Sequence, residues 1–219
     1  MANIQVYYFM GSPPCRAVFM TAKALGVPLE LKELKYVNSD HHKPEYTKIN
    51  PDQIVPTMID GDFILGESRA IMRYLVGKYG GEDNNLYPRD LKKRAEVDRL
   101  LDYDLGIFFK VIVEDLWLPF RDRIPKTKQQ EEKIVKIFTR IDTLLRDKNF
   151  LTGDTMTIAD LSIVASFTVE LVYEGDMSKF PNAMAWYKRM QELPYFKEVN
   201  ENFYEWVNKV KKLHAEMSA

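Results

Sequence analysis

The chain has little of what several common protein classes require. Its 219 residues include one cysteine, Cys15, which cannot form an internal disulfide and is typical of a reducing compartment. The three histidines, His41, His42 and His214, lack the spacing of a metal-ligand set, so we expect no metal ion. These shortages exclude disulfide-stabilised secreted scaffolds and structural zinc modules.

Long apolar runs and basic blocks are also missing. No run of apolar residues approaches the roughly 20 that a membrane-spanning helix requires. The N-terminal segment MANIQVYYFMGS has neither the charged start nor the cleavage site of a signal peptide. A net charge of −1 without a basic block argues against a nucleic-acid surface. We expect a cytoplasmic protein with no membrane partner and no nucleic-acid partner.

The beginning of the chain predicts a strand followed by a helix. The segment Ile4–Phe9 is rich in β-branched and aromatic residues and predicts a buried strand. A glycine and two prolines interrupt it, and the segment from Arg16 to Leu25 has helical periodicity. Proline is tolerated in the first helical turn, where its missing N–H has no partner. We therefore expect Ser12 in the strand-to-helix turn, with its hydroxyl near the helix N-terminus.

A hairpin is predicted between residues 54 and 65. Two apolar runs, Ile54–Ile59 and Phe63–Leu65, are joined by an Asp-Gly pair, which is a strong hairpin signal. Pro56 cannot donate to a sheet ladder, so we expect a bend there, with a cis Val55–Pro56 bond that presents backbone to a ligand. Ser68 is then the expected N-cap of an apolar helix.

The element order divides the chain into two domains. A strand at Leu29 and Leu31 and a helical turn at Lys43–Lys48 complete the order βαβαββα for the first part. Turn-forming residues dominate from Gly80 to Asp90, where we place the boundary. The expected fold is an α/β domain over residues 1–80, a linker over 81–90 and an all-helical domain over 91–219.

The second part predicts helices only. Apolar periodicity runs from Leu91 to about Arg123, with an interruption at Gly106 and a bend or break near Pro119. The sequence Thr157-Ile158-Ala159-Asp160 is a capping box, and the nearly all-apolar stretch that follows predicts a central buried helix. Further helices are expected over residues 126–146, 182–192 and from 195 to the end.

Six short motifs occur together in a fixed order, and each one alone is weak. They are Tyr8 through Arg16 (YFMGSPPCR), Asn50-Pro51, Ile54-Val55-Pro56-Thr57, Glu67-Ser68-Arg69-Ala70-Ile71, Leu86-Tyr87-Pro88 and Thr157-Ile158-Ala159-Asp160. In this combination the chain resembles a cytosolic glutathione transferase of the insect delta and epsilon classes. The resemblance implies a thioredoxin-like N-terminal domain followed by an all-helical domain, and glutathione as co-substrate.

The resemblance implies that Ser12 is the catalytic residue. Glutathione reacts as its thiolate, and a hydrogen bond from a hydroxyl together with a helix N-terminus favours that anion. The alternative is that Ser12 only caps the helix, and the two roles are compatible. Thiol-transferase classes carry a cysteine where Ser12 stands. Cys15 lies one turn further on, and we expect it to pack inward rather than to act as the nucleophile.

The resemblance also implies two groups of binding residues. For glutathione, Val55 and Pro56 present backbone, Glu67 and the Ser68 region hold the γ-glutamyl end, and His41 faces the glycine end. Gln53 stands where delta enzymes commonly carry a second histidine, and Arg69 matches the family's arginine. A solvated loop histidine remains an alternative for His41. The expected electrophile pocket is lined by Phe9, Pro13, Phe108, Trp117, Phe120 and Phe203, with Tyr204 nearby, although aromatic residues at helical spacing are more often core.

The implied function is detoxification by a homodimeric transferase that conjugates glutathione to small hydrophobic electrophiles, that is, xenobiotic metabolism. Dehydrochlorination or peroxide reduction at the same thiolate is one alternative, and a non-catalytic carrier of hydrophobic ligands is another. An interaction module without activity is disfavoured by the presence of Ser12. In the expected dimer, Arg69 or Arg73 of one subunit reaches acidic residues on the long helix of the other. Asp160 is expected to have a structural role as a buried cap.

Overall fold

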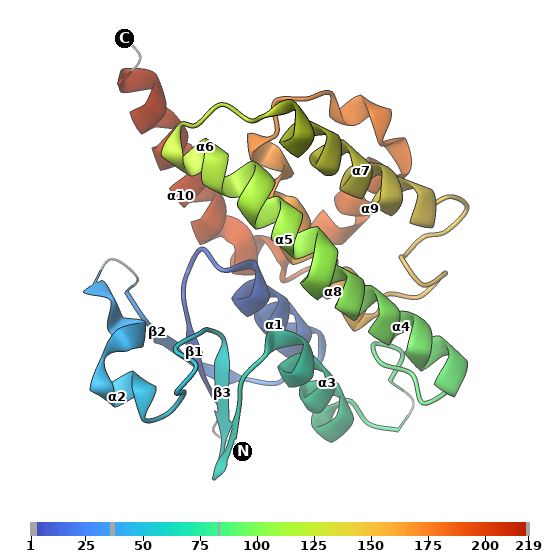
Figure 1. Cartoon of the computed structure of the whole chain (residues 1–219). Helices are drawn as coiled ribbons and strands as arrows, with labels where there is room; N and C mark the ends of the chain where they lie inside the picture. The colour runs from blue at the N-terminus through green and yellow to red at the C-terminus, as the bar shows by residue number, and fades with distance from the viewer. Residues whose placement is uncertain (1–3, 36–37, 83, 218–219) are drawn as a thin grey trace.

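The first part of the chain forms a four-stranded mixed sheet. A computed structural model describes residues 4–35, 38–82 and 84–217 (Figure 1). The strand order is β2-β1-β3-β4, with β1 parallel to β2 and antiparallel to β3, and with β3 antiparallel to β4. The strands are β1 (Ile4–Tyr8), β2 (Leu29–Glu33), β3 (Thr57–Asp60) and β4 (Phe63–Leu65). The predicted strands and the predicted hairpin are confirmed.

Helices cover the two faces of this sheet unequally. On one face, α1 (Pro13–Ala24) packs against α3 (Ser68–Tyr79), and the buried side chains of Ile4 and Val6 point toward this layer. On the other face lies the short α2 (Pro44–Thr47), and the ring centre of its Tyr46 is 5.5 Å from that of Tyr7. Figure 1 shows α1 enclosed between the sheet and the helical part of the chain. The resulting order is the predicted βαβαββα.

One long rod dominates the helical part (green in Figure 1). It consists of α4 (Leu91–Tyr103), η3 (Asp104–Phe108), α5 (Phe109–Val111), η4 (Ile112–Trp117) and α6 (Leu118–Asp122). The segments η3 and η4 are wider π-helical turns, and Gly106 lies in the first of them. Pro119 is the second residue of α6, with one residue between it and the end of the second wide turn, and such a turn accommodates a residue that cannot donate a backbone bond. The rod continues through Pro119 and ends at Asp122.

The other helices surround α8, which is the buried centre of this part. They are α7 (Lys128–Leu144), α8 (Ile158–Phe167), η5 (Thr168–Val172), η6 (Met177–Lys179), α9 (Pro181–Gln191) and α10 (Phe196–Glu216). All ten residues of α8 are buried. The Asp160 carboxylate accepts hydrogen bonds from the N–H groups of Thr157 (2.9 Å) and Leu151 (2.8 Å) and from the indole of Trp186 (3.0 Å). The predicted structural role of Asp160 is confirmed.

Two buried arginines connect the sheet domain to the helices. Arg16 of α1 donates to the Thr168 hydroxyl (3.0 Å), the Asn200 amide oxygen (2.5 Å) and the Ala165 carbonyl (3.1 Å). Arg69 of α3 donates to Asp104 in the long rod at 2.5 Å. These links fix the N-terminal ends of α1 and α3 relative to the helical part.

One expectation about this region is corrected. The helix α3 begins at Ser68, so Glu67 occupies the cap position without a side-chain cap bond, and the predicted Ser68 cap is wrong. Arg69 pairs with Asp104 of its own chain. Arg73 likewise pairs with Asp98 of its own chain, at 2.8 Å. Within the described ranges, no helix is both long and apolar enough to span a membrane.

Candidate functional site

Ser12 lies at the N-terminus of α1, where its hydroxyl is close to the first backbone amides of the helix. Its extended backbone (φ −75°, ψ 114°) ends the turn that leaves β1, and its Oγ accepts from the Cys15 N–H at 3.4 Å. The prolines at positions 13 and 14 follow directly and start the helix. An accepted bond leaves the hydroxyl hydrogen available. Ser12 can therefore cap the helix and donate to an anion at the same time.

A cavity of about 530 Å³ opens beside this hydroxyl. Its size is within the range of about 300–1,000 Å³ that is usual for small-molecule sites. It is lined by Phe9, Ser12, Leu34, His41, His42, Asp52, Gln53, Ile54 and Val55. The structure thus brings Ser12 together with four other residues that the sequence assigned to the site, namely Phe9, His41, Gln53 and Val55.

Buried polar groups shape the loop that forms the opposite wall. The Asn50 amide donates to the Ile54 carbonyl (3.1 Å) and to the Thr57 hydroxyl (2.8 Å). The Tyr46 hydroxyl bonds to the same two groups. The Val55–Pro56 bond is cis, as predicted, and Pro56 is buried behind Val55. The Ile54 carbonyl is therefore turned inward, and Val55 lies at the cavity wall.

Two histidines and a glutamine form the polar end of the cavity. The His42 Nδ1 lies 2.6 Å from the Gln53 Oε1, and the rings of His41 and His42 are 3.9 Å apart. Burial, followed by the neighbouring His42, lowers the pKa of His41. His42 was not assigned to the site from sequence, although its position next to His41 was the available signal. The lowered pKa of His41 favours its neutral imidazole, which can still form hydrogen bonds.

The residues expected at the γ-glutamyl end do not border this cavity. Glu67 is exposed, with a positive φ of 61°, just before α3. The buried Ser68 hydroxyl accepts from Arg69 at 3.1 Å. The Arg69 guanidinium is buried between Ser68 and Asp104, so in this structure its described contacts are with the protein. Arg69 holds Ser68 in place.

Two of the expected pocket aromatics belong to the core. Phe108 is fully buried and stacks parallel to Phe167 with centroids 6.5 Å apart. Phe203 is also buried, and the Arg16 guanidinium lies 4.1 Å from its ring centre. Both assignments are wrong, because these side chains fill the helical core rather than the cleft. Pro13 is half-buried at the start of α1.

The remaining aromatics lie along the rod and α10. Trp117 is half-buried and contacts Trp206 of α10 at 4.9 Å. Phe120 contacts His214 at 5.1 Å and borders a different cavity, of about 810 Å³. Trp206 was not identified from sequence. A Cβ atom at Gly11 would lie 3.0 Å from the Trp206 ring, so any larger residue would crowd this close approach next to Ser12.

Cys15 faces away from the cavity. Its side chain is fully buried, and burial is the main reason why its pKa is raised to about 11. A neutral, inaccessible thiol is a poor nucleophile. The expectation that Cys15 packs inward is confirmed.

Known proteins resemble this chain in sequence and in fold. Residues 6–83 match the family described as the glutathione S-transferase N-terminal domain, and residues 108–194 match its C-terminal domain. Glutathione S-transferase D7 of Drosophila melanogaster is 37% identical over 188 residues, which cover 86% of this chain and 84% of the relative. A delta-class glutathione transferase structure from Nilaparvata lugens is 38% identical, with a TM-score of 0.88 and coverage of 96% and 99%. An epsilon-class structure from Musca domestica is 36% identical, with the same TM-score of 0.88 and coverage of 96% and 98%.

Proposed function

Since this chain belongs to the glutathione S-transferase family and uses glutathione as its co-substrate, we propose that Ser12 donates a hydrogen bond to the glutathione sulfur. The observation that carries this proposal is the position of the Ser12 hydroxyl at the N-terminus of α1, on the wall of a cavity that fits a small peptide. A cysteine-type thiol has a pKa of about 8.5 and is mostly protonated at neutral pH. The hydroxyl and the helix N-terminus both stabilise the thiolate and lower that pKa.

The thiolate then attacks an electrophilic carbon. A carbon–sulfur bond forms, the leaving group departs with its electron pair, and the proton released from the thiol passes to solvent. The protein contributes the orientation of the sulfur and the stabilisation of its charge, because both are preorganised before the electrophile arrives.

The rest of the tripeptide has a proposed contact at each end. Val55 offers backbone N–H and C=O groups to the cysteinyl unit, supported by Pro56. Gln53 and His41 donate to the glycyl carboxylate, with His42 orienting Gln53. Glu67 attracts the γ-glutamyl ammonium, and the N-terminus of α3 at Ser68 attracts the adjacent carboxylate.

We propose small hydrophobic electrophiles as the second substrate. Phe9 and Pro13 lie beside Ser12, and the close approach of Trp206 to Gly11 extends this apolar surface to the long rod. Trp117 and Phe120 continue it through their contact at 5.6 Å. Such a surface binds apolar rings without selecting a single shape.

We also propose how the chain is divided into domains and how it assembles. Residues 1–80 form the glutathione-binding domain, residues 91–219 form the helical domain that contributes the electrophile pocket, and residues 81–90 link them. The protein is proposed to act as a cytoplasmic homodimer, since its family relatives share the whole fold and exposed apolar residues occur along the rod.

The Ser12→Ala variant tests the proposed role. We expect kcat/KM with a chloro-nitroaromatic substrate to fall by about 10- to 1,000-fold. The pKa seen in its pH profile should rise toward that of free glutathione. Thr127→Ala is the matched control, because Thr127 caps α7 in the same way but is remote from the site. Equal effects in both variants, or an unchanged pH profile in Ser12→Ala, would reject the assignment.

A further inference from the structure

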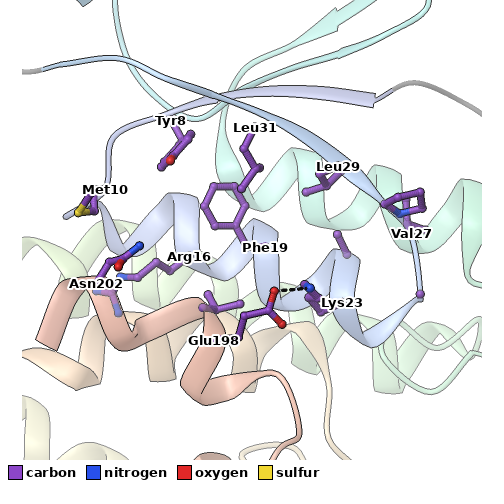
Figure 2. A pocket seen from close by; sticks show the side chains of 14 residues that line it. Tyr8, Met10, Arg16, Phe19, Lys23, Val27, Leu29, Leu31, Glu198 and Asn202 are labelled. Carbon is purple, nitrogen blue, oxygen red and sulfur yellow. Dashed lines mark hydrogen bonds and ion pairs between the residues drawn. The ribbon is translucent and has the colours of Figure 1, made fainter. Parts of the chain in front are cut away.

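Tyr46 of α2 lies on the face of the sheet opposite α1. Its ring centre is 5.5 Å from that of Tyr7 in β1. The next residue of the strand, Tyr8, faces the other way and lines a second cavity, of about 540 Å³, along α1 (Figure 2). Tyr46 is 3% exposed and is not among the described residues that line the Ser12 cavity. Any effect of Tyr46 on a ligand in that cavity must therefore pass through another residue.

The Tyr46 hydroxyl belongs to a closed set of hydrogen bonds behind the cavity wall. The Asn50 amide donates to the Ile54 carbonyl (3.1 Å) and to the Thr57 hydroxyl (2.8 Å). The Tyr46 hydroxyl donates to the same carbonyl, and its oxygen lies 2.8 Å from the Thr57 oxygen. Because the Tyr46 hydrogen is used on Ile54, the Thr57 hydroxyl donates to Tyr46. Every polar hydrogen of these three side chains therefore has an acceptor, and both lone pairs of the Ile54 carbonyl are occupied.

The inward Ile54 carbonyl sets the direction of the Val55 N–H. The two groups belong to one peptide unit, which is trans, and the C=O and N–H of a trans peptide point in opposite directions. The donors on the carbonyl are buried side chains on the protein side of the loop, whereas Val55 lines the Ser12 cavity. The bonds from Tyr46 and Asn50 therefore turn the Val55 N–H toward the cavity.

The backbone of Tyr46 connects this loop to the histidine wall of the cavity. The segment η2 (Asp40–His42) is followed closely by α2, and the Asn50 N–H donates to the Tyr46 carbonyl at 2.9 Å. The contact between His42 and Gln53 joins the same two segments, but His42 is exposed. Tyr46 is thus a buried link between the two polar walls.

We propose that Tyr46 is a positioning residue for glutathione. Its hydroxyl holds the Ile54 carbonyl inward, so that the Val55 N–H is aimed at the cysteinyl carbonyl of glutathione before binding. This inference rests on the proposed contact between Val55 and the cysteinyl unit. The contact is the same in the ground state and in the transition state, because the cysteinyl carbonyl does not react. Its loss therefore raises KM for glutathione and leaves kcat unchanged.

The Tyr46→Phe variant, which keeps the ring and removes the hydroxyl, tests this role. We expect KM for glutathione to rise by about three- to tenfold. The effect is moderate because the Thr57 hydroxyl lies 3.2 Å from the Ile54 carbonyl and can partly replace the lost donor. Both kcat with a chloro-nitroaromatic substrate and the pH profile should match those of wild type. Tyr79→Phe is the matched control, because it removes a tyrosine hydrogen bond of the same domain, to Asp60 at 2.6 Å. An unchanged KM in Tyr46→Phe, or an equal rise in Tyr79→Phe, would overturn the proposal.

A ligand without the cysteinyl carbonyl separates positioning from general loosening of the loop. S-hexyl-γ-glutamylcysteamine keeps the amide N–H of the cysteinyl unit but lacks that carbonyl. In calorimetry, Tyr46→Phe should bind S-hexylglutathione about three- to tenfold more weakly than wild type does, and should bind the cysteamine analogue equally well. Equal weakening of both ligands would refute positioning through Val55. If wild type binds the two ligands with the same affinity, the proposed Val55 contact itself is wrong, whatever Tyr46→Phe does.

Discussion

Ser12 and Cys15 lie one helical turn apart on α1 but differ in their access to solvent. The Ser12 hydroxyl borders the cavity, whereas the Cys15 thiol is fully buried. The Cys15 N–H donates to Ser12, so the backbone of the cysteine supports the serine while its side chain supports the core. One turn of α1 therefore holds both a side chain with a proposed chemical role, Ser12, and a side chain that packs in the core, Cys15.

Burial of Cys15 predicts a specific pH dependence of stability. The pKa of its thiol rises from 9.0 to about 11 on folding. A raised folded-state pKa contributes stability below pH 9, and this contribution is lost as the pH rises toward 11. In urea unfolding, the stability advantage of wild type over Cys15→Ala should shrink by about 2 to 3 kcal/mol across this window. A constant difference between the two proteins would contradict the burial of a neutral thiol.

The exposed position of Glu67 predicts a modest contribution to glutathione affinity. An ion pair in contact with water is usually worth less than about 1 kcal/mol. Glu67→Gln should therefore weaken glutathione binding by at most about fivefold in calorimetry. Glu82→Gln is the control, because Glu82 is also exposed and pairs only weakly with Arg89 at 3.6 Å. A loss of more than about a hundredfold would mean that glutathione desolvates the carboxylate on binding.

At the scale of elements, features that depend on neighbouring residues were predictable from the sequence, whereas side-chain contacts between distant segments were not. The hairpin at Asp60-Gly61, the cis Val55–Pro56 bond and the capping box at Asp160 each depend on neighbouring residues, and all were found from sequence. Phe108 and Phe203 were misassigned because helical spacing shows that they share a face but not what covers that face. His42 and Trp206 were missed because their partners, Gln53 and Gly11, are distant in the chain.

The contact between α3 and the long rod depends on one buried ion pair. Asp104 accepts from Arg69 and also from the hydroxyls of Ser162 and Ser166, so this carboxylate joins three elements. Asp104→Asn leaves the buried Arg69 charge without a counter-ion, and we expect a loss of about 3–5 kcal/mol in the free energy of unfolding. The Arg69→Met, Asp104→Leu double variant should recover part of this loss.

The neighbouring Arg73–Asp98 pair provides a matched control for this ion pair. It also joins α3 to the long rod, through α4 instead of η3, but its side chains are about one third exposed. Asp98→Asn should therefore cost less than about 1 kcal/mol in the same urea experiment. Comparable losses for the two aspartates would show that burial is not what makes the Asp104 contact strong.

At the scale of the whole molecule, the two domains meet through α1, with one cavity on each side of it. The Ser12 hydroxyl, which we propose to act on the glutathione sulfur, lies at the N-terminus of this helix, and a second cavity lies along its side. Arg16 connects α1 to α8 and α10 through buried hydrogen bonds. The same helix therefore positions the chemistry, joins the domains and forms a wall of the second cavity.

The exposed apolar residues of the rod predict how two copies associate. Arg69 and Arg73 are paired within their own chain, so we expect apolar contacts rather than inter-subunit ion pairs to stabilise a dimer. Leu105 is 47% exposed and follows Asp102 on the flank of the rod beside α3. Analytical ultracentrifugation at micromolar concentration should give about twice the chain mass of 25.6 kDa.

A charge at Leu105 should dissociate this dimer. In a twofold interface each substitution occurs twice, so Leu105→Glu places two buried charges in the contact and should yield a 25.6 kDa species. Ile124→Glu is the control, because Ile124 is 60% exposed but follows α6, the last helix of the rod, which ends at Asp122. Glutathione binding should persist in both variants, since neither residue lines the Ser12 cavity. If the dimer persists in Leu105→Glu but dissociates in Ile124→Glu, the interface lies near Ile124 and not near Leu105.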